Sequence, residues 1–204
     1  VTWDTYHDQW ISEGLAQFST ILYLREEYGE AAFSNILEKI SGWVKKKAKW
    51  GPIIFGSRIS YFDFHAFQTI IYNKTALVLN MLRDMLGEEA FFQGMRVFFE
   101  RFKHGTASTH DFSQTLSEFA EQDLRPFFQD WFESYSLPDV RVTHSLEKEE
   151  KGYKLLFSID QLADTFIFPL WIEWIEAGKR VRRMILIDQK EQNFEFRSEE
   201  RRVG

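Results

Sequence analysis

The spacing of apolar residues changes once along this chain, near Pro138. Before that proline they recur every three or four positions, as at Ile11, Leu15 and Phe18, which is the period of one face of an α-helix. After it, short β-branched and aromatic runs are separated by polar turns, which is typical of β-strands. The sequence therefore predicts an α+β chain, with a helical part over residues 1–137 and a β part over residues 138–204.

The helical part divides at glycines and prolines. We expect helices over residues 8–28, 30–49, 66–86, 88–105, 108–123 and 124–135. Gly29 and Gly87 serve as stops, and "GPIIFGSRIS" is interpreted as a connecting loop. Ser108 and Thr109, two to three residues ahead of Asp111, form a capping-box-like start to one of these helices.

The β part contains five strand-like runs: "VRVTHSLE", "YKLLFSID", "FIFPLWIEWIEA", "KRVRRMILID" and "QNFEFRS". The "EAGK" between the third and the fourth favours a hairpin. Strands of this length and spacing indicate a small β-sandwich.

Composition excludes several classes of function. The net charge is -6 and no basic stripe is present, so we expect no nucleic-acid partner. The chain has no cysteine, which excludes disulfides, thiolate metal sites and a cysteine nucleophile. It has no apolar run of about 18 residues, so we expect no membrane segment in it. The chain starts at Val1 without an initiator Met, and we expect it to be a piece of a longer protein.

Glu13 is the first candidate functional residue. On a helical wheel it lies nearly opposite Leu15, which alone predicts an exposed or half-exposed carboxylate. Trp10 and Leu24 share its side of the helix, however, so both faces are expected to be covered. A carboxylate between two packed faces needs a positive partner, and a metal ion is one such partner. The five histidines show no HxH or HExxH spacing that would complete a metal site.

Tyr72 is the second candidate. It flanks an apolar stripe that includes Ile71, Val78 and the stem of Lys74, so the pattern alone indicates a tyrosine at the edge of the core. A phenol that faces a cleft can instead donate a hydrogen bond to a developing oxyanion. The pattern leaves both interpretations open.

The segment "WISEGLA" resembles the M1 family of zinc aminopeptidases, the gluzincins related to aminopeptidase N and leukotriene A4 hydrolase. In that family an HExxH motif is followed, after eighteen intervening residues, by a glutamate within such a stretch. The resemblance gives Glu13 the position of the third zinc ligand. Both histidine ligands and the general-base glutamate of HExxH then fall before Val1.

Two later segments extend the resemblance. "YNKTALVLNMLRDMLG" is similar to the family's Y-x-K-G-A stretch, whose tyrosine stabilises the tetrahedral intermediate, and that role transfers to Tyr72. Thr75 stands where the family usually has glycine. "DWFESYSLP" matches a further family segment at Trp131 and Pro138, with Ser136 in place of the usual glycine.

The resemblance implies the helical C-terminal half of a thermolysin-like catalytic domain over residues 1–137, followed by a small immunoglobulin-like β-sandwich over 138–204. The parent protein would be a zinc metallo-aminopeptidase that cleaves N-terminal peptide bonds of peptide substrates. Because the HExxH segment is absent, this fragment is expected to be inactive. It is also expected to pack against the missing upstream part of its own polypeptide, or to self-associate through apolar surface around Trp3, Tyr6 and Trp10.

Two alternatives stay open. Some M1-like proteins keep the fold, lose the zinc ligands and act as interaction modules, although such a scaffold has no need of both Glu13 and Tyr72. The other is epoxide hydrolase activity, as in the leukotriene branch. An intact HExxH upstream of Glu13 would favour the peptidase over the scaffold.

Overall fold

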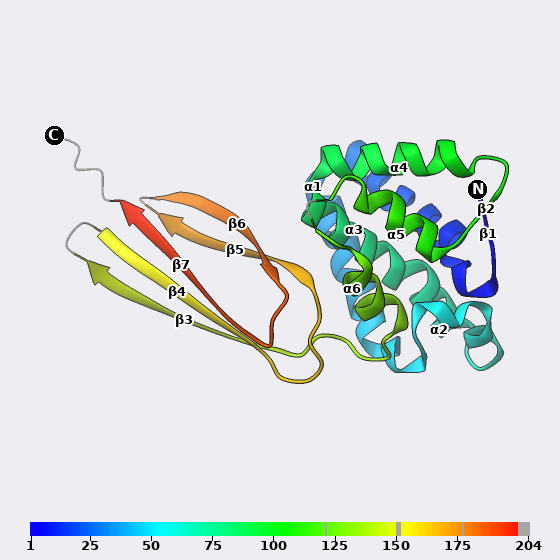
Figure 1. Ribbon diagram of the computed structural model, residues 1–204. Helices are drawn as coiled ribbons and strands as arrows, with labels where there is room; N and C mark the ends of the chain where they lie inside the picture. Colours follow the sequence, from blue (N-terminus) through cyan, green and yellow to red (C-terminus); the bar gives the residue numbers. More distant parts are fainter. Residues whose placement is uncertain (121, 150–151, 177, 200–204) are drawn as a thin grey trace. The chain divides into compact units, whose positions relative to one another are not determined.

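A computed structural model describes residues 1–120, 122–149, 152–176 and 178–199. The chain forms two compact units, Val1–Leu137 and Pro138–Gly204. Helices make up most of the first unit and strands make up the second (Figure 1). The predicted α+β fold class is therefore confirmed.

The first unit is built on a long helix and shorter helices that follow it. The helices are α1 (Trp10–Lys47), α2 (Phe64–Phe67), α3 (Thr75–Leu86), α4 (Glu88–Phe102), α5 (Thr109–Ser117) and α6 (Arg125–Phe128). Two-residue strands β1 (Thr2–Trp3) and β2 (Thr106–Ala107) pair in parallel and connect the start of the chain to the segment before α5. None of the helices within the described ranges is both long and apolar enough to cross a membrane.

The predicted break in the first long helix is confirmed at Gly29. Its φ of 81° and ψ of 178° lie outside the helical region, so α1 consists of two helical stretches that meet there. This backbone conformation is essentially restricted to glycine. The "GPIIFGSRIS" segment is more regular than the loop we expected, because Ile53–Tyr61 forms successive 3₁₀ turns that bend at Gly56.

Two of the predicted helices contain a π-helical segment, in which the helix is wider than an α-helix. The helix expected over residues 66–86 includes a first π-helix, Gln68–Lys74, between α2 and α3. The helix expected over 124–135 continues from α6 into a second π-helix, Gln129–Glu133. Single π-turns inside α-helices occur frequently at functional sites. Apolar periodicity predicted the helices but not this local widening.

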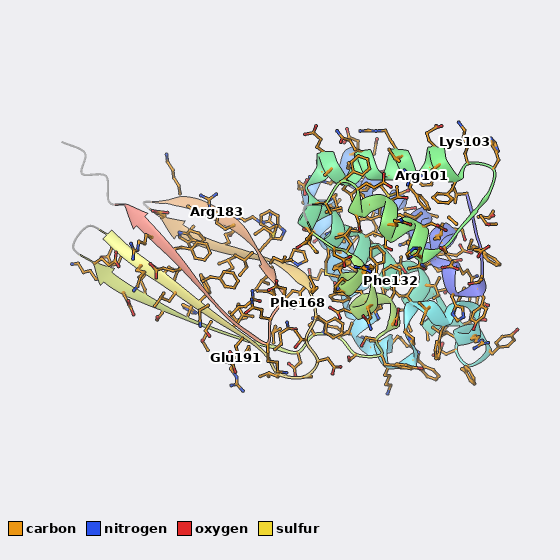
Figure 2. The ribbon with its side chains drawn as sticks, in the orientation of Figure 1. Arg101, Lys103, Phe132, Phe168, Arg183 and Glu191 are labelled. Carbon is orange, nitrogen blue, oxygen red and sulfur yellow. The ribbon has the colours of Figure 1, made fainter. Side chains whose placement is uncertain are left out.

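Aromatic side chains fill much of the core of the first unit. Trp10 is fully buried and makes edge-on ring contacts with Phe112 and Phe132, with centroids 5.0 and 4.8 Å away. Phe132 lies within the helical unit (Figure 2). The prediction that Trp10 contributes to an exposed apolar surface is therefore wrong, because these rings cover its side chain. Trp3 is 40% exposed, as that expectation required.

The second unit has two antiparallel sheets. Strands β3 (Val140–Glu149), β4 (Gly152–Gln161) and β7 (Glu191–Glu199) form one, in the order β3-β4-β7. Strands β5 (Phe168–Glu176) and β6 (Lys179–Ile187) form the other, as the hairpin signal predicted. Trp174 and Phe196 bring the two sheets into contact, with ring centroids 5.0 Å apart.

One buried polar side chain organises the connection after β4. The Gln161 amide donates to the backbone oxygens of Phe166 (2.9 Å) and Gln189 (3.1 Å), and its oxygen accepts from the Phe166 N–H. Gln161 is only 1% exposed, so these bonds offset the cost of burying a polar amide.

Candidate active site

The candidate site lies where α1 crosses the first π-helix. A Cβ atom placed on Gly14 would lie 2.3 Å from Cγ2 of Thr75 and 3.2 Å from the backbone oxygen of Ile71. Only a residue without a side chain allows so close an approach. Glu13 directly precedes Gly14 and Tyr72 directly follows Ile71, so this crossing brings the two predicted site residues together.

Glu13 and Tyr72 interact through their side chains, and both are half-buried. Burial, the hydrogen bond to Glu13 and the negative charge of that carboxylate together raise the pKa of the Tyr72 phenol to about 12. The phenol therefore keeps its proton at neutral pH. The site combines a carboxylate that can ligate a metal with a hydroxyl that can donate a hydrogen bond.

The first π-helix also orients the Tyr72 ring. Phe67 contacts it edge-on, with centroids 5.9 Å apart. The Thr75 hydroxyl is 3.5 Å from the backbone oxygen of Ile70, a carbonyl at the widened part of the coil. Thr75 occupies the position where the family usually has glycine. Its side chain is fully buried against Gly14, so α1 accommodates the larger residue.

A buried carboxylate fixes the start of α1. Asp8 accepts hydrogen bonds from the backbone N–H (2.7 Å) and the hydroxyl (2.8 Å) of Thr109. The same hydroxyl accepts from the indole N–H of Trp10 at 2.8 Å. Asp8 also accepts from the Thr5 hydroxyl at 2.7 Å. These bonds join the first turn of α1, which includes Glu13, to the first turn of α5.

Sequence reasoning did not identify Asp8 as part of this network, because Thr109 is about one hundred residues away in the chain. It also gave no role to Lys74, whose ammonium is buried and donates to the Ser134 backbone oxygen at 3.3 Å. A signal for Lys74 was present, since a lysine on a stripe of apolar residues at helical spacing is an unusual arrangement.

The part of the chain that the structure describes contains no group of three or more His, Asp or Glu side chains placed to hold a metal. His7 is the histidine nearest to Glu13 in the sequence. Its Nδ1 atom lies 2.7 Å from the backbone oxygen of Ile54. This contact favours a packing role for His7.

Comparisons with known proteins identify relatives of this chain. The chain is similar to rat glutamyl aminopeptidase, with 26% identity over 190 residues that cover 87% of this chain and 20% of that protein. It is 33% identical to Escherichia coli (strain K12) aminopeptidase N over 97 residues, which cover 47% of this chain and 11% of that one. The chain therefore spans a fifth or less of the length of these two relatives.

A solved structure shares the fold. The crystal structure of Legionella pneumophila aminopeptidase A in complex with aspartic acid matches with a TM-score of 0.76 at 19% identity, covering 96% of this chain and 22% of that chain.

A model of the peptidase family M1 domain matches residues 1–131. The match covers more than half of the chain and includes the crossing of α1 with the first π-helix. On this evidence, the chain belongs to peptidase family M1.

Proposed function

We propose that this chain carries part of the active site of a zinc-dependent aminopeptidase that hydrolyses the N-terminal bond of peptides. The contact between Glu13 and Tyr72 is the observation that carries the proposal. These two residues were expected from separate motifs, 59 positions apart in the sequence, and the fold brings them together. The related proteins are themselves named aminopeptidases.

The chemistry of Glu13 fits a zinc ligand. A carboxylate oxygen is a suitable donor to Zn²⁺, and a His₂Glu set with an open fourth position is typical of catalytic zinc. Since the described residues include no group of three side chains that could hold a metal ion, we propose that Glu13 shares the ion with histidines from another part of a longer polypeptide. Bound there, zinc would polarise the carbonyl group and lower the pKa of water.

Tyr72 supplies the other function on this chain. A phenol with a pKa of about 12 holds its proton and can donate a hydrogen bond to a carbonyl oxygen as negative charge develops on it. Phe67 and the first π-helix restrict the ring, so that little reorganisation is needed when substrate binds. The same pairing favours an enzyme over a non-catalytic scaffold, which has no need of a donor beside a metal ligand.

The two units take separate roles in this proposal. Residues 1–137 would form the helical part of the catalytic domain, and residues 138–204 an immunoglobulin-like β-sandwich domain. The chain alone would be inactive, because one carboxylate does not hold zinc tightly. Metal analysis of the purified chain is expected to find no stoichiometric zinc. A full equivalent of zinc, retained through dialysis without any added partner, would disprove this part of the proposal.

We also propose that other parts of the same longer polypeptide cover exposed aromatic residues near the site. Tyr61, Phe62 and Phe64 are 85%, 79% and 58% exposed. Apolar surface of this kind promotes association in an isolated chain. Light scattering is expected to show copies of the chain associating as concentration rises, and less association in a Tyr61→Ser/Phe62→Ser variant. A monomer at every concentration would contradict this.

The role of Tyr72 is tested in a longer, zinc-loaded polypeptide that contains this chain. Tyr72→Phe removes only the hydroxyl, and kcat is expected to fall about 100- to 1,000-fold with little change in KM or zinc content. Tyr23→Phe is the matched control, because Tyr23 is 61% exposed on α1. Full activity in Tyr72→Phe would remove the proposed role of this residue.

A further inference from the structure

Lys74 is a buried cation two residues after Tyr72, at the end of the first π-helix. Its side chain is 1% exposed, and its ammonium donates to the backbone oxygen of Ser134 at 3.3 Å. Desolvation lowers the pKa of Lys74 to about 8. Burying an ammonium group costs stability, and an apolar side chain of similar length would avoid that cost. The lysine therefore calls for an explanation other than stability.

The partner of Lys74 directly follows the second π-helix. Ser134 comes after Glu133, the last residue of that helix. Ser134 caps that helix with an extended backbone (φ -84°, ψ 143°), and its carbonyl oxygen accepts a hydrogen bond from the buried ammonium. One hydrogen bond thus joins the end of the first π-helix to the end of the second.

The second π-helix is fixed in turn against α1. Its Phe132 ring lies 4.8 Å from the ring of Trp10, the first residue of α1. Trp10 lies one helical turn before Glu13. Contacts therefore run from Lys74 through the second π-helix to the turn of α1 that carries Glu13, while the Glu13–Tyr72 contact joins α1 back to the first π-helix.

We propose that Lys74 is a positioning residue: its hydrogen bond to Ser134 holds the first π-helix in the orientation that keeps the Tyr72 hydroxyl beside the Glu13 carboxylate. The importance of this orientation for catalysis rests on the function proposed above. The link between Lys74 and Tyr72 itself is a property of this chain and can be tested on it directly.

The first test uses NMR of the chain at neutral pH with ¹³C-labelled tyrosine ζ carbons. Tyr72→Phe assigns the Tyr72 signal, and Glu13→Ala gives the change that follows loss of the contact. Lys74→Met is expected to change the chemical shift of the Tyr72 signal in the same direction as Glu13→Ala. Lys74→Arg keeps a donor and is expected to change that chemical shift less.

Lys46→Met is the control, because Lys46 is exposed on α1. An unmoved Tyr72 signal in Lys74→Met would overturn the proposal. Should that variant not fold, the same measurement on Lys74→Gln decides.

The second test uses the zinc-loaded longer polypeptide. Lys74→Met is expected to lower kcat about 10- to 100-fold with KM nearly unchanged, since small displacements of a catalytic group have effects of this size. The Tyr72→Phe/Lys74→Met double variant is expected to be no less active than Tyr72→Phe alone. Fully additive losses would mean that Lys74 acts independently of Tyr72, and would also overturn the proposal. If Tyr72→Phe proves fully active, the proposed function fails, and the NMR measurement still decides the role of Lys74.

Discussion

Gly14 lies where α1 crosses the first π-helix, and its missing side chain permits the contact on which the candidate site depends. The neighbouring Thr75 is fully buried and β-branched, so its side chain has few alternative rotamers. Because Glu13 and Tyr72 flank this crossing, any widening of it separates them. At the scale of single residues, packing at Gly14 and the geometry of the site are therefore coupled.

Gly14→Ala is expected to destabilise the chain by about 1–3 kcal/mol, because the new methyl group would lie 2.3 Å from Thr75 Cγ2 and one side must shift. Gly42→Ala is the matched control on the same helix, where an added Cβ has no neighbour within 4 Å. Gly42→Ala is expected to stabilise the folded chain by roughly 0.5–1 kcal/mol, because alanine has a higher helix propensity than glycine. Urea unfolding measures both, and equal stability changes in the two variants would contradict the packing argument.

The burial of Lys74 predicts a pH dependence of stability. Its pKa in the folded chain is about 8, below the ordinary value of 10.5, so the unfolded chain binds this proton more tightly. Between these two pH values the free energy of unfolding is expected to rise with pH, by on the order of 2–3 kcal/mol in total. Tyr72, whose pKa is raised, acts in the opposite direction above about pH 10.

Urea unfolding of the chain and of Lys74→Met at pH 8, 9 and 10 tests this expectation. The stability advantage of the methionine variant should shrink as pH rises, because the wild type gains stability while Lys74 loses its proton. Parallel stability curves for the two proteins would show that Lys74 titrates normally.

Glu13 and Tyr72 were predictable from the sequence as candidates, but only with the help of family motifs. Helical periodicity alone allowed an exposed carboxylate and a tyrosine at the core edge. Their contact depends on the crossing of two helices at Gly14, which no local pattern specifies. The apolar stripe around Lys74 hinted at its burial, but its acceptor could not be predicted, since it is a backbone oxygen 60 residues later.

At the scale of elements, the chain uses polar side chains to fix helix ends. Asp8 joins the start of α1 to that of α5 through Thr109. Ser108 and Asp111 form the predicted capping box: the Ser108 N–H donates to the carboxylate at 2.8 Å, and the Ser108 hydroxyl accepts from the Asp111 N–H at 3.2 Å. Bonds of this kind set the position of a helix along its axis, which apolar packing defines less sharply.

Asp8→Ala is expected to destabilise the first unit by about 2–4 kcal/mol, because the half-buried N–H and hydroxyl of Thr109 and the hydroxyl of Thr5 lose a buried, charged acceptor. Asp4→Ala is the control, since Asp4 is exposed and accepts only a 3.3 Å bond from Thr106. That change should stay within about 0.5 kcal/mol. Thermal or urea unfolding followed by circular dichroism compares them, and a mild effect of Asp8→Ala would count against the network.

Element positions were largely predictable, and element shapes were not. The break at Gly29, the capping box at Ser108 and the β5–β6 hairpin follow from local residue preferences, and all three are confirmed. The two π-helices and the 3₁₀ turns of Ile53–Tyr61 were not predicted. Their form depends on contacts with other elements, such as Tyr6, whose backbone oxygen lies against Gly56.

At the scale of the whole molecule, the change of apolar period near Pro138 coincides with the division into two units at Leu137 and Pro138. The helical unit contains the candidate site, and the β unit is held together by its own core and by Gln161. Since the described residues include no group of three side chains that could hold a metal ion, the proposed zinc binding is expected to depend on a longer polypeptide, with Glu13 as an indispensable ligand.

Zinc content of that longer polypeptide, measured with and without Glu13, tests this claim most directly. The unaltered polypeptide is expected to hold one zinc ion and to release N-terminal residues from peptides. Glu13→Ala should weaken zinc binding about 100-fold or more and abolish hydrolysis, whereas Glu26→Ala, which removes an exposed carboxylate from the same helix, should change neither. A Glu13→Ala protein that keeps a full equivalent of zinc and its peptidase activity would contradict the account.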